Sequence, residues 1–534
     1  MRRFGTVFPF LEAGTQARHV GRLVANHDFV KAVLEFGDFD EFLFSNPSVT
    51  NLKLFQETAA SWGLPGRRID RIRSVSYTEL PTVLRRDDFQ VFHLGGWSRM
   101  MAGLHYVRAR YAPVRWPITA VTHSLHGREV IDHVVRLSHA GLAPHDAVFC
   151  TSRDGREAMR RLLDAGERIA GRRFAGQLVH LPLGISDGLL DARGDRDRGR
   201  SRLAIPAEAV VLLVLGRMTP VQKMDVGPLC RVLAMRVVPS SAVPVVLLLA
   251  GAATPQELAV VKRQVDRHGL DASVRWAANF PLEDKADVLA TADILVSPVD
   301  NTQETFGLSV LEAMAAGLPV VVSRFDGYKD LVEDGVDGFL VDTWWSEHDP
   351  VDEWFDLMDG DIAQMFQSQS VAVDLEQLGD RLLTLIGDPG RRSMMGRAGR
   401  AKVESTYRWS RVIARYQREW ARLRAEAERT VAEPAGENPY GLGSARIFSG
   451  YAAHQLGPET RVRATAPFLD EAPCTETATL ITPRAVLAVH AAATAGATVA
   501  DLVEASGTSD AAGWFVVAWM LKHGLLRLEK PPAP

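Results

Sequence analysis

Short apolar runs recur along most of this chain, and each is followed by a polar or glycine-containing turn. Such runs occupy residues 4–10, 41–46, 89–93, 118–122 and 147–151, and then 210–215, 245–250, 273–277, 292–298 and 320–323. Helix-like patterns separate many of them. Alternating buried strands and helices are typical of parallel sheets covered on both faces. The sequence therefore predicts the α/β class, with ligands bound beyond the carboxyl ends of the strands.

Length and charge narrow the class of protein further. The chain has 534 residues, enough for about three or four domains of ~150 residues each. Its 46% hydrophobic and 24% charged residues fit a folded protein with sizeable cores. The net charge of -4 gives no global bias towards nucleic acid or an anionic membrane.

Cysteine usage and the apolar runs indicate a compartment. Cys150, Cys230 and Cys474 lie far apart and have neither metal-binding spacing nor a disulfide pattern, which favours a reducing cytosol. The first apolar stretch is short and meets Glu12, so we expect no signal peptide. The longest apolar runs fall short of the ~18 residues of a spanning helix. We expect a cytoplasmic protein, with peripheral contact at the inner membrane face left open.

Residues 299–327 form the most informative stretch. A polar loop containing Glu304 follows a buried strand, and an apolar helix is predicted over residues 308–316, with Gly317 as its stop. The first turn of a helix offers unpaired N–H groups and suits a phosphate. Carboxylates beside a phosphate are better suited to hydroxyl groups, so Glu304 and Glu312 predict a ligand with both. A nucleotide-sugar has both.

Glu304 and Glu312, with seven residues between them and Phe306, Gly307 and Leu308 inside, resemble the E-x7-E motif of retaining glycosyltransferases with the GT-B fold, of the family 4 or group 1 type. The resemblance implies two Rossmann-like domains. It implies that Glu304 meets the donor sugar and takes part in catalysis, that Glu312 holds the ribose, and that the backbone of residues 306–308 approaches the sugar. The family usually has Pro where this chain has Thr305. Incidental glutamates in an ordinary strand–loop–helix are the alternative.

Two further loops extend the resemblance to the donor diphosphate. Gly216-Arg217 follows the strand at 210–215, with Lys223 close behind, as in the family. Arg217 and Lys223 would neutralise the leaving diphosphate, in place of a metal ion. Gly14 alone remains of the Gly-Gly pair that the family often has after its first strand, near the diphosphate. The alternative for the two cations is an ordinary surface position.

Histidines follow two strands of the first domain. His123, at the end of the strand at 118–122, resembles the family histidine that faces the donor sugar, and it is our second candidate catalytic residue. His126 is a weaker candidate. For His93 we prefer a tight turn with a satisfied histidine. The basic run of Arg67, Arg68, Arg71 and Arg73 is interpreted as a solvated helix face. A patch for an anionic acceptor or a membrane is the alternative.

The predicted organisation has five parts. They are an acceptor domain at 1–186, a donor domain at 205–400, a crossover helix at 401–425, a linker at 426–479 and a small module at 480–530. Residues 193–202, rich in Asp, Arg and Gly, are expected to form an exposed linker. Residues 343–374 lengthen the usual connection and are interpreted as an insertion. A position at the cleft rim and a packed surface excursion both stay open.

The C-terminal module resembles a winged helix, with three helices and one strand expected. The helix at 511–522, in the place of a recognition helix, is nearly all apolar and carries one Lys, which argues against DNA binding. We expect the module to dock a partner or a second subunit, or to present the acceptor.

The resemblance implies an enzyme of the hexosyltransferase type. It would move a sugar from a nucleotide-sugar to an acceptor with retention of anomeric configuration, with no cofactor and no metal. The sugar, the base, the oligomeric state and the acceptor (polysaccharide, lipid carrier, small molecule or peptide) stay open. A non-catalytic sugar-nucleotide-binding scaffold and an epimerase or phosphorylase of similar fold are the alternatives. Replacing Glu304 or Lys223 with Ala is expected to abolish transfer and to shift the melting temperature by only a few degrees.

Overall fold

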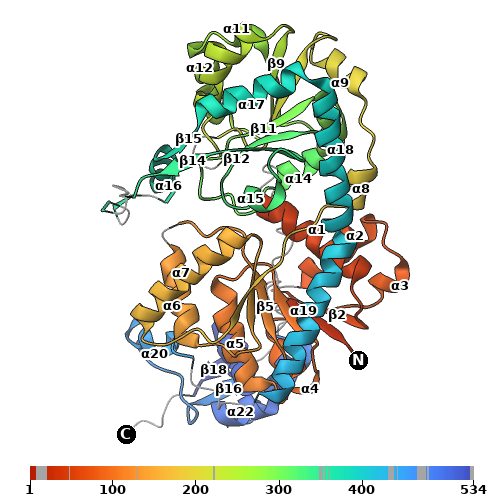
Figure 1. Ribbon diagram of the computed structural model, residues 1–534. Helices are drawn as coiled ribbons and strands as arrows, with labels where there is room; N and C mark the ends of the chain where they lie inside the picture. Colours follow the sequence, from red (N-terminus) through yellow and green to blue (C-terminus); the bar gives the residue numbers. More distant parts are fainter. Residues whose placement is uncertain are drawn as a thin grey trace.

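The computed structural model describes residues 1–7, 21–46, 49–127, 129–219, 223–347, 353–354, 357–358, 360–430, 438–441, 443–465, 477 and 480–529. Two parallel sheets, each covered by helices, make up most of this part of the chain (Figure 1). The predicted α/β class with two Rossmann-like domains is confirmed.

The first sheet has seven parallel strands in the order β3-β2-β1-β4-β5-β6-β7. In chain order the strands are β1 (Arg3–Val7), β2 (Glu41–Asn46), β3 (Ile72–Ser76), β4 (Val91–Leu94), β5 (Ile118–Val121), β6 (Ala147–Cys150) and β7 (Gln177–His180). The helices between them are α1 (Gly21–Phe36), α2 (Val49–Ser61), α3 (Gly66–Ile69), α4 (Leu80–Arg86), α5 (Arg99–Tyr111), α6 (Glu129–Ala140) and α7 (Arg153–Ala170). The strands β4, β5 and β6 are buried along their whole length, as a sheet covered on both faces requires.

The second sheet has six parallel strands in the order β10-β9-β8-β11-β12-β13. They are β8 (Val210–Leu215), β9 (Val245–Gly251), β10 (Val274–Ala278), β11 (Ile294–Ser297), β12 (Val320–Ser323) and β13 (Gly338–Val341). The helices are α8 (Asp187–Asp191), α9 (Arg196–Arg202), α10 (Gly227–Val232), α11 (Val238–Ser240), α12 (Pro255–Arg267), α13 (Lys285–Thr291), α14 (Leu308–Ala315), α15 (Tyr328–Leu331), α17 (Leu375–Gly387) and α18 (Pro389–Thr406).

Each sheet reverses its strand order at one point. The reversal falls between β1 and β4 in the first sheet and between β8 and β11 in the second. Loops leaving the carboxyl ends of two such strands diverge to opposite faces of the sheet and leave a crevice, which is where open α/β sheets bind their ligands. The crevice between β8 and β11 therefore positions the candidate site.

A long helix, α19 (Trp409–Arg429), links the two domains. It follows α18 along one edge of the molecule (Figure 1). Backbone hydrogen bonds join Ile185 to Tyr407 and Trp409, and the Trp420 indole donates to Thr119 Oγ1 of β5 at 3.1 Å. Tyr416 and Trp420 lie fully buried against aromatic side chains of the first domain. The aromatic face of α19 thus becomes part of the first domain's core.

Two sequence interpretations are wrong because bonds to residues far along the chain override local composition. The basic run does not form one helix face: Arg68 lies in α3 and Arg73 in β3. Arg68 and Arg71 donate to the backbone carbonyls of residues 37 and 39. Residues 193–202 are no exposed linker either, because α9 packs on α13 there and Arg200 is buried, paired with Asp293.

The insertion forms a small unit of its own. It consists of β14 (Thr343–Trp345), α16 (Gly360–Gln369) and β15 (Val371–Val373), and β14 and β15 pair antiparallel. One face of α16 is buried, including Ala363, Gln364 and Ser368.

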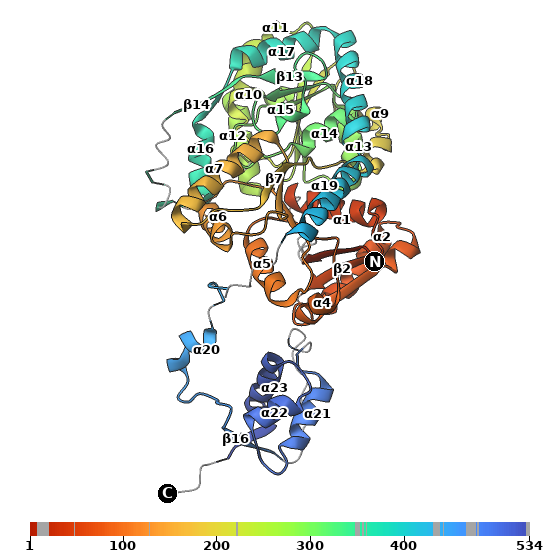
Figure 2. The same cartoon turned by 60° about the horizontal axis from the view of Figure 1, so that its bottom comes forward.

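The C-terminal module has three helices, α21 (Pro483–Ala492), α22 (Val499–Ala505) and α23 (Asp510–Lys522), and it lies apart from the sheet domains (Figure 2). The short α20 (Ser444–Ile447) precedes it. Its sheet has three strands in the order β17 (Ala497–Thr498), β16 (Arg461–Ala464) and β18 (Leu526–Leu528). Because β16 is the central strand, the module includes residues that we expected to be linker. No helix in the described part of the chain is both long and apolar enough to cross a bilayer.

Candidate functional site

The loop after β8 carries the first cations of the site. All six residues of β8 are buried, so the strand holds the start of this loop rigidly. The guanidinium of Arg217 donates to the side-chain carbonyl of Gln303 at 2.8 Å. Gln303 precedes Glu304 in the loop after β11, so Arg217 already ties together the two loops that flank the crevice.

Lys223 and Glu304 form a largely buried ion pair at the same place. Their side chains are 16% and 15% exposed, and the Lys223 ammonium bonds the Glu304 carboxylate. The Tyr328 hydroxyl lies 3.5 Å from both Lys223 Nζ and Glu304 Oε2, and 2.9 Å from Ser297 Oγ. Tyr328 is fully buried. The sequence thus brings an ammonium, a carboxylate and a phenol together beyond the ends of β8 and β11.

Charge pairing keeps both members of this pair ionised. Burial by itself would lower the pKa of Lys223, but the Glu304 charge and Tyr328 outweigh it and raise that pKa. Burial would raise the pKa of Glu304, but the Lys223 charge outweighs it and holds that pKa below its usual value. Burial raises the pKa of Tyr328 to about 12, so the phenol stays protonated at neutral pH.

The start of α14 lies beside this pair. Gly307 is the N-cap residue, with φ of 110°, and Phe306 N–H donates to Glu304 Oε1 at 3.4 Å. A Cβ on Gly307 would lie 2.5 Å from the Tyr328 ring. Only glycine fits this backbone conformation and this space. Helix N-termini carry N–H groups without intrahelical partners, which suits an anion next to Lys223.

Glu312 lies further along α14 and has a different partner. Its carboxylate pairs with Lys285 Nζ, from the first turn of α13, and its side chain is 13% exposed. The two glutamates of the motif therefore occupy separate ion pairs on the same loop and helix. A ligand that bound both glutamates would displace Lys223 from Glu304 and Lys285 from Glu312.

His123 reaches the site from the first domain through its backbone. Its carbonyl accepts from Thr305 Oγ1 at 2.6 Å, and Thr305 lies next to Glu304. The imidazole Nε2 lies 2.8 Å from Asn26 Oδ1 and 2.9 Å from Gly95 O. Both oxygens accept, so Nε2 carries the proton. Burial, with the Arg22 charge, lowers the pKa of His123 to about 4, so the ring is neutral at pH 7.

A second set of contacts joins the domains next to the site. Ser152, the N-cap of α7, donates to Asp326 Oδ1 at 2.7 Å, and Arg153 N donates to Asp330 Oδ2 at 2.7 Å. Burial raises the pKa of Asp326 to about 7, and the Glu304 charge adds to this. A Cβ on the neighbouring Gly327 would meet the Phe306 backbone at 2.5 Å. The loop after β12 therefore packs directly on the Glu304–Phe306 segment.

The structure brings Arg217, Lys223, Glu304 and residues 306–308 together and places Glu312 in a separate ion pair. Gly14 lies outside the described residues. His93 lies inside the strand β4, not in the tight turn expected from the sequence; it is fully buried, and its Nδ1 lies 2.8 Å from Thr119 Oγ1.

Sequence reasoning missed Tyr328, Ser297, Asp326 and Lys285. Asp326 lies at the end of the stretch of residues 299–327 and Tyr328 directly follows that stretch, and this position was the available signal. Ser297 and Lys285 gave no signal. Within the described ranges, no group of three or more His, Cys, Asp or Glu side chains could hold a metal ion.

A sequence profile of the family described as "Glycosyl transferases group 1" matches residues 209–352, so this part of the chain is similar to group 1 glycosyltransferase domains. D-inositol 3-phosphate glycosyltransferase 1 of Catenulispora acidiphila is 26% identical over 340 residues, covering 61% of this chain and 71% of that protein. The corresponding enzyme of Saccharomonospora viridis is 34% identical over 168 residues, covering 31% of this chain. That match spans only 37% of the Saccharomonospora protein, and a match of similar extent spans 34% of a Corynebacterium kroppenstedtii relative.

Solved structures of similar fold include Anabaena HepE in complex with UDP, with a TM-score of 0.53 and 17% identity over 78% of this chain and 99% of that one. Sucrose-phosphate synthase of Thermosynechococcus elongatus has a TM-score of 0.54 and 16% identity, over 80% of this chain and 100% of that one. The predicted GT-B architecture is confirmed.

Proposed function

We propose that this chain is a retaining, metal-independent glycosyltransferase that uses a nucleotide-sugar donor. The Lys223–Glu304 pair carries the proposal, because it lies where the second sheet reverses its strand order, with Arg217 beside it. A cation, a carboxylate and a helix N-terminus at one crevice match a ligand that has a diphosphate next to hydroxyl groups.

Donor binding has to rearrange the ion pairs. Lys223 would exchange Glu304 for the diphosphate, and Glu304 would then accept hydrogen bonds from sugar hydroxyls. Glu312 would exchange Lys285 for the ribose hydroxyls in the same way. Phe306, Gly307 and Leu308 would offer backbone N–H groups to the donor, and Gly14 stays a proposed diphosphate contact on the resemblance alone.

The chemical step then needs charge neutralisation more than a base. The bond between the anomeric carbon and the diphosphate oxygen breaks, and its electron pair leaves with the diphosphate. Lys223 and Arg217 stabilise this charge, as fixed cations do in a water-poor site. The acceptor oxygen attacks the same face of the sugar, and its proton passes to a diphosphate oxygen. His123, neutral at pH 7, would accept a hydrogen bond at Nδ1 from the sugar, since its Nε2 proton faces Asn26 Oδ1 and Gly95 O.

We also propose that the enzyme acts in a reducing compartment such as the cytoplasm. Cys150 and Cys230 are buried free thiols, and burial raises the pKa of each to about 12. Thiols in that state are poor nucleophiles and need no oxidising partner. Cys474 lies outside the described residues.

Two measurements test the proposal. Calorimetry with UDP, GDP and ADP, each with and without EDTA, should show binding of at least one diphosphate that EDTA does not weaken. UDP comes first because the Anabaena structure contains it, and D-inositol 3-phosphate joins the panel of acceptors because it appears in the relatives' names. The product of a UDP-sugar should keep the donor's anomeric configuration by NMR.

Four outcomes would contradict the proposal: no diphosphate binds, EDTA removes activity, the anomer inverts, or the donor isomerises without an acceptor. Diphosphate binding without turnover of any nucleotide-sugar would favour a binding scaffold.

A further inference from the structure

We propose that α16 of the insertion is a brace that holds both loops of the proposed donor site in place, namely the loop after β8 and the loop after β11. Gln364 and Gln369 are the positioning residues that make these contacts. The inference rests on the proposed function only for what the loops do, because the contacts themselves are present without a ligand.

Gln364 begins a chain of hydrogen bonds that ends at Arg217. Its side-chain amide is only 2% exposed and donates to Asn301 Oδ1. The same Asn301 oxygen accepts from the backbone N–H of Gln303 at 2.9 Å. Gln303 Oε1 in turn accepts from Arg217 at 2.8 Å. Three residues of the donor domain are thus linked to one side chain of the insertion.

The polarity of this chain is fixed at each step. Gln364 donates, so Asn301 must present its carbonyl oxygen, and that oxygen is free to hold the Gln303 N–H. The loop is then held in a conformation in which the Gln303 carbonyl faces the guanidinium of Arg217. Buried polar networks with every member satisfied specify a single arrangement. A leucine at position 364 would fill the space but would leave Asn301 Oδ1 with the Gln303 N–H as its one remaining donor of the two described here.

Gln369, the last residue of α16, contacts the loop that carries Lys223. Its amide donates to Asp225 Oδ2 at 3.1 Å, and Gln264 donates to Asp225 Oδ1 at 2.6 Å. The backbone N–H of Asp225 donates to Asp300 Oδ2 at 3.4 Å, so the two loops are also joined to each other. Asp225 lies two residues after Lys223, and Asp300 lies four residues before Glu304.

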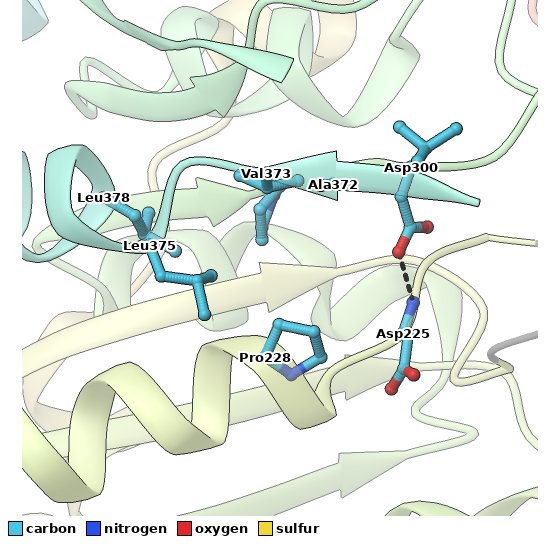
Figure 3. Close-up of a pocket in the computed structure, with 9 residues that line it drawn as sticks. Asp225, Pro228, Asp300, Ala372, Val373, Leu375 and Leu378 are labelled. Atoms are coloured by element: carbon cyan, nitrogen blue, oxygen red, sulfur yellow. Dashed lines mark hydrogen bonds between the residues drawn. The ribbon is translucent and has the colours of Figure 1, made fainter. Parts of the chain in front are cut away.

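The same two loops and the end of the insertion enclose a small cavity of about 200 Å³ (Figure 3). Asp225 lines it from one loop, Pro228 from the first turn of α10 and Asp300 from the other loop, while β15 and the start of α17 close it. Asp300 is 5% exposed, and burial raises its pKa to about 8. A carboxyl that is neutral at pH 7 forms no ion pair between the two loops. The bonds from Gln364 and Gln369 of α16 therefore help to hold the loops together.

Exchange of backbone amides in the unliganded full-length protein tests the brace without requiring activity. Gln364→Glu keeps the shape but removes the donor, and we expect amides within residues 301–307 to exchange at least fivefold faster. Gln369→Ala changes an exposed side chain and should likewise speed the exchange of backbone amides within residues 223–227. The matched control is Gln367→Glu, which adds the same charge to α16 at a residue without a described bond to either loop; it should leave both segments unchanged.

Kinetics separate positioning from stability. With the nucleotide-sugar that wild type turns over, Gln364→Glu should raise the donor KM about fivefold to tenfold and change kcat less, while Gln367→Glu matches wild type. Unchanged exchange of residues 301–307 in Gln364→Glu, or equal acceleration in the Gln367→Glu control, would overturn the brace. If wild type binds no nucleoside diphosphate, the proposed function fails, and the exchange result still decides this inference.

Discussion

Removing one member of the Lys223–Glu304 pair should make the stability of the donor domain depend on pH. Lys223→Met keeps the aliphatic stem and leaves the Glu304 carboxylate buried beside Tyr328 without its cation. Burial then favours the protonated acid. A glutamate with an ordinary pKa of about 4.3 costs about 1.36 kcal/mol per pH unit to keep neutral, which is about 3.7 kcal/mol at pH 7 and about 1 kcal/mol at pH 5. The larger figure agrees with the ~3–5 kcal/mol of a broken buried pair.

The sign follows from the folded-state pKa. In the variant that pKa is raised, so the loss of stability is small at low pH and grows as the pH rises. Urea denaturation of wild type and Lys223→Met at pH 5, 6 and 7, followed by tryptophan fluorescence, measures the difference. The double variant Lys223→Met/Glu304→Gln has no buried charge and should recover most of the loss. An equal loss at pH 5 and 7, or a double variant as unstable as the single one, would refute the reasoning.

The remaining predictions concern three other parts of the site. His123→Gln should lower kcat/KM for the donor at least tenfold and leave diphosphate affinity within twofold, checked by calorimetry; an equal loss of both would argue against a sugar contact. Burial raises the pKa of Asp326 to about 7, so this buried carboxyl destabilises the folded protein increasingly as the pH rises towards 7. Asp326→Asn should therefore raise the melting temperature more at pH 7 than at pH 5, and an identical gain at both would exclude the titration. Gly307→Ala should cost about 1–3 kcal/mol from strained backbone and more from contact with Tyr328. Gly317→Ala, with φ of 80° and open space around it, is the control that isolates the strain, and equal urea midpoints would refute the steric part.

Much of the architecture could be predicted because it depends on local patterns. The buried strand β8 consists of apolar residues alone and β12 of three valines and a serine, and the bounds of both match the expected runs. The strand β3 was missed because its sequence, Ile-Arg-Ser-Val-Ser, alternates weakly and follows a segment with arginines at positions 67, 68 and 71. The helix α9 was missed because its arginines are stabilised by Asp287 and Asp293, almost a hundred residues away.

The site itself was predicted only where residue type and spacing carry it. Arg217, Lys223 and Glu304 could be named from their loops, but the pairing of Lys223 with Glu304 could not, since it joins strands that are neighbours only in the folded sheet. That pairing also revises the expected thermal behaviour of the alanine variants. A loss of several kcal/mol corresponds to roughly 2–4 °C for each kcal/mol in a domain of this size, more than the few degrees expected from the sequence.

Thr305, the residue next to Glu304, forms hydrogen bonds that join the two sheet domains. Its hydroxyl bonds the carbonyl of residue 123 and its carbonyl accepts from Thr151, both across the domain boundary. Proline, usual here in the family, has no hydroxyl to offer. Any hinge opening must break both bonds and release the peptide that aims the carboxylate. If Glu304 meets the donor sugar as we propose, opening the two domains would loosen that carboxylate, and the opened molecule should hydrolyse the donor only slowly.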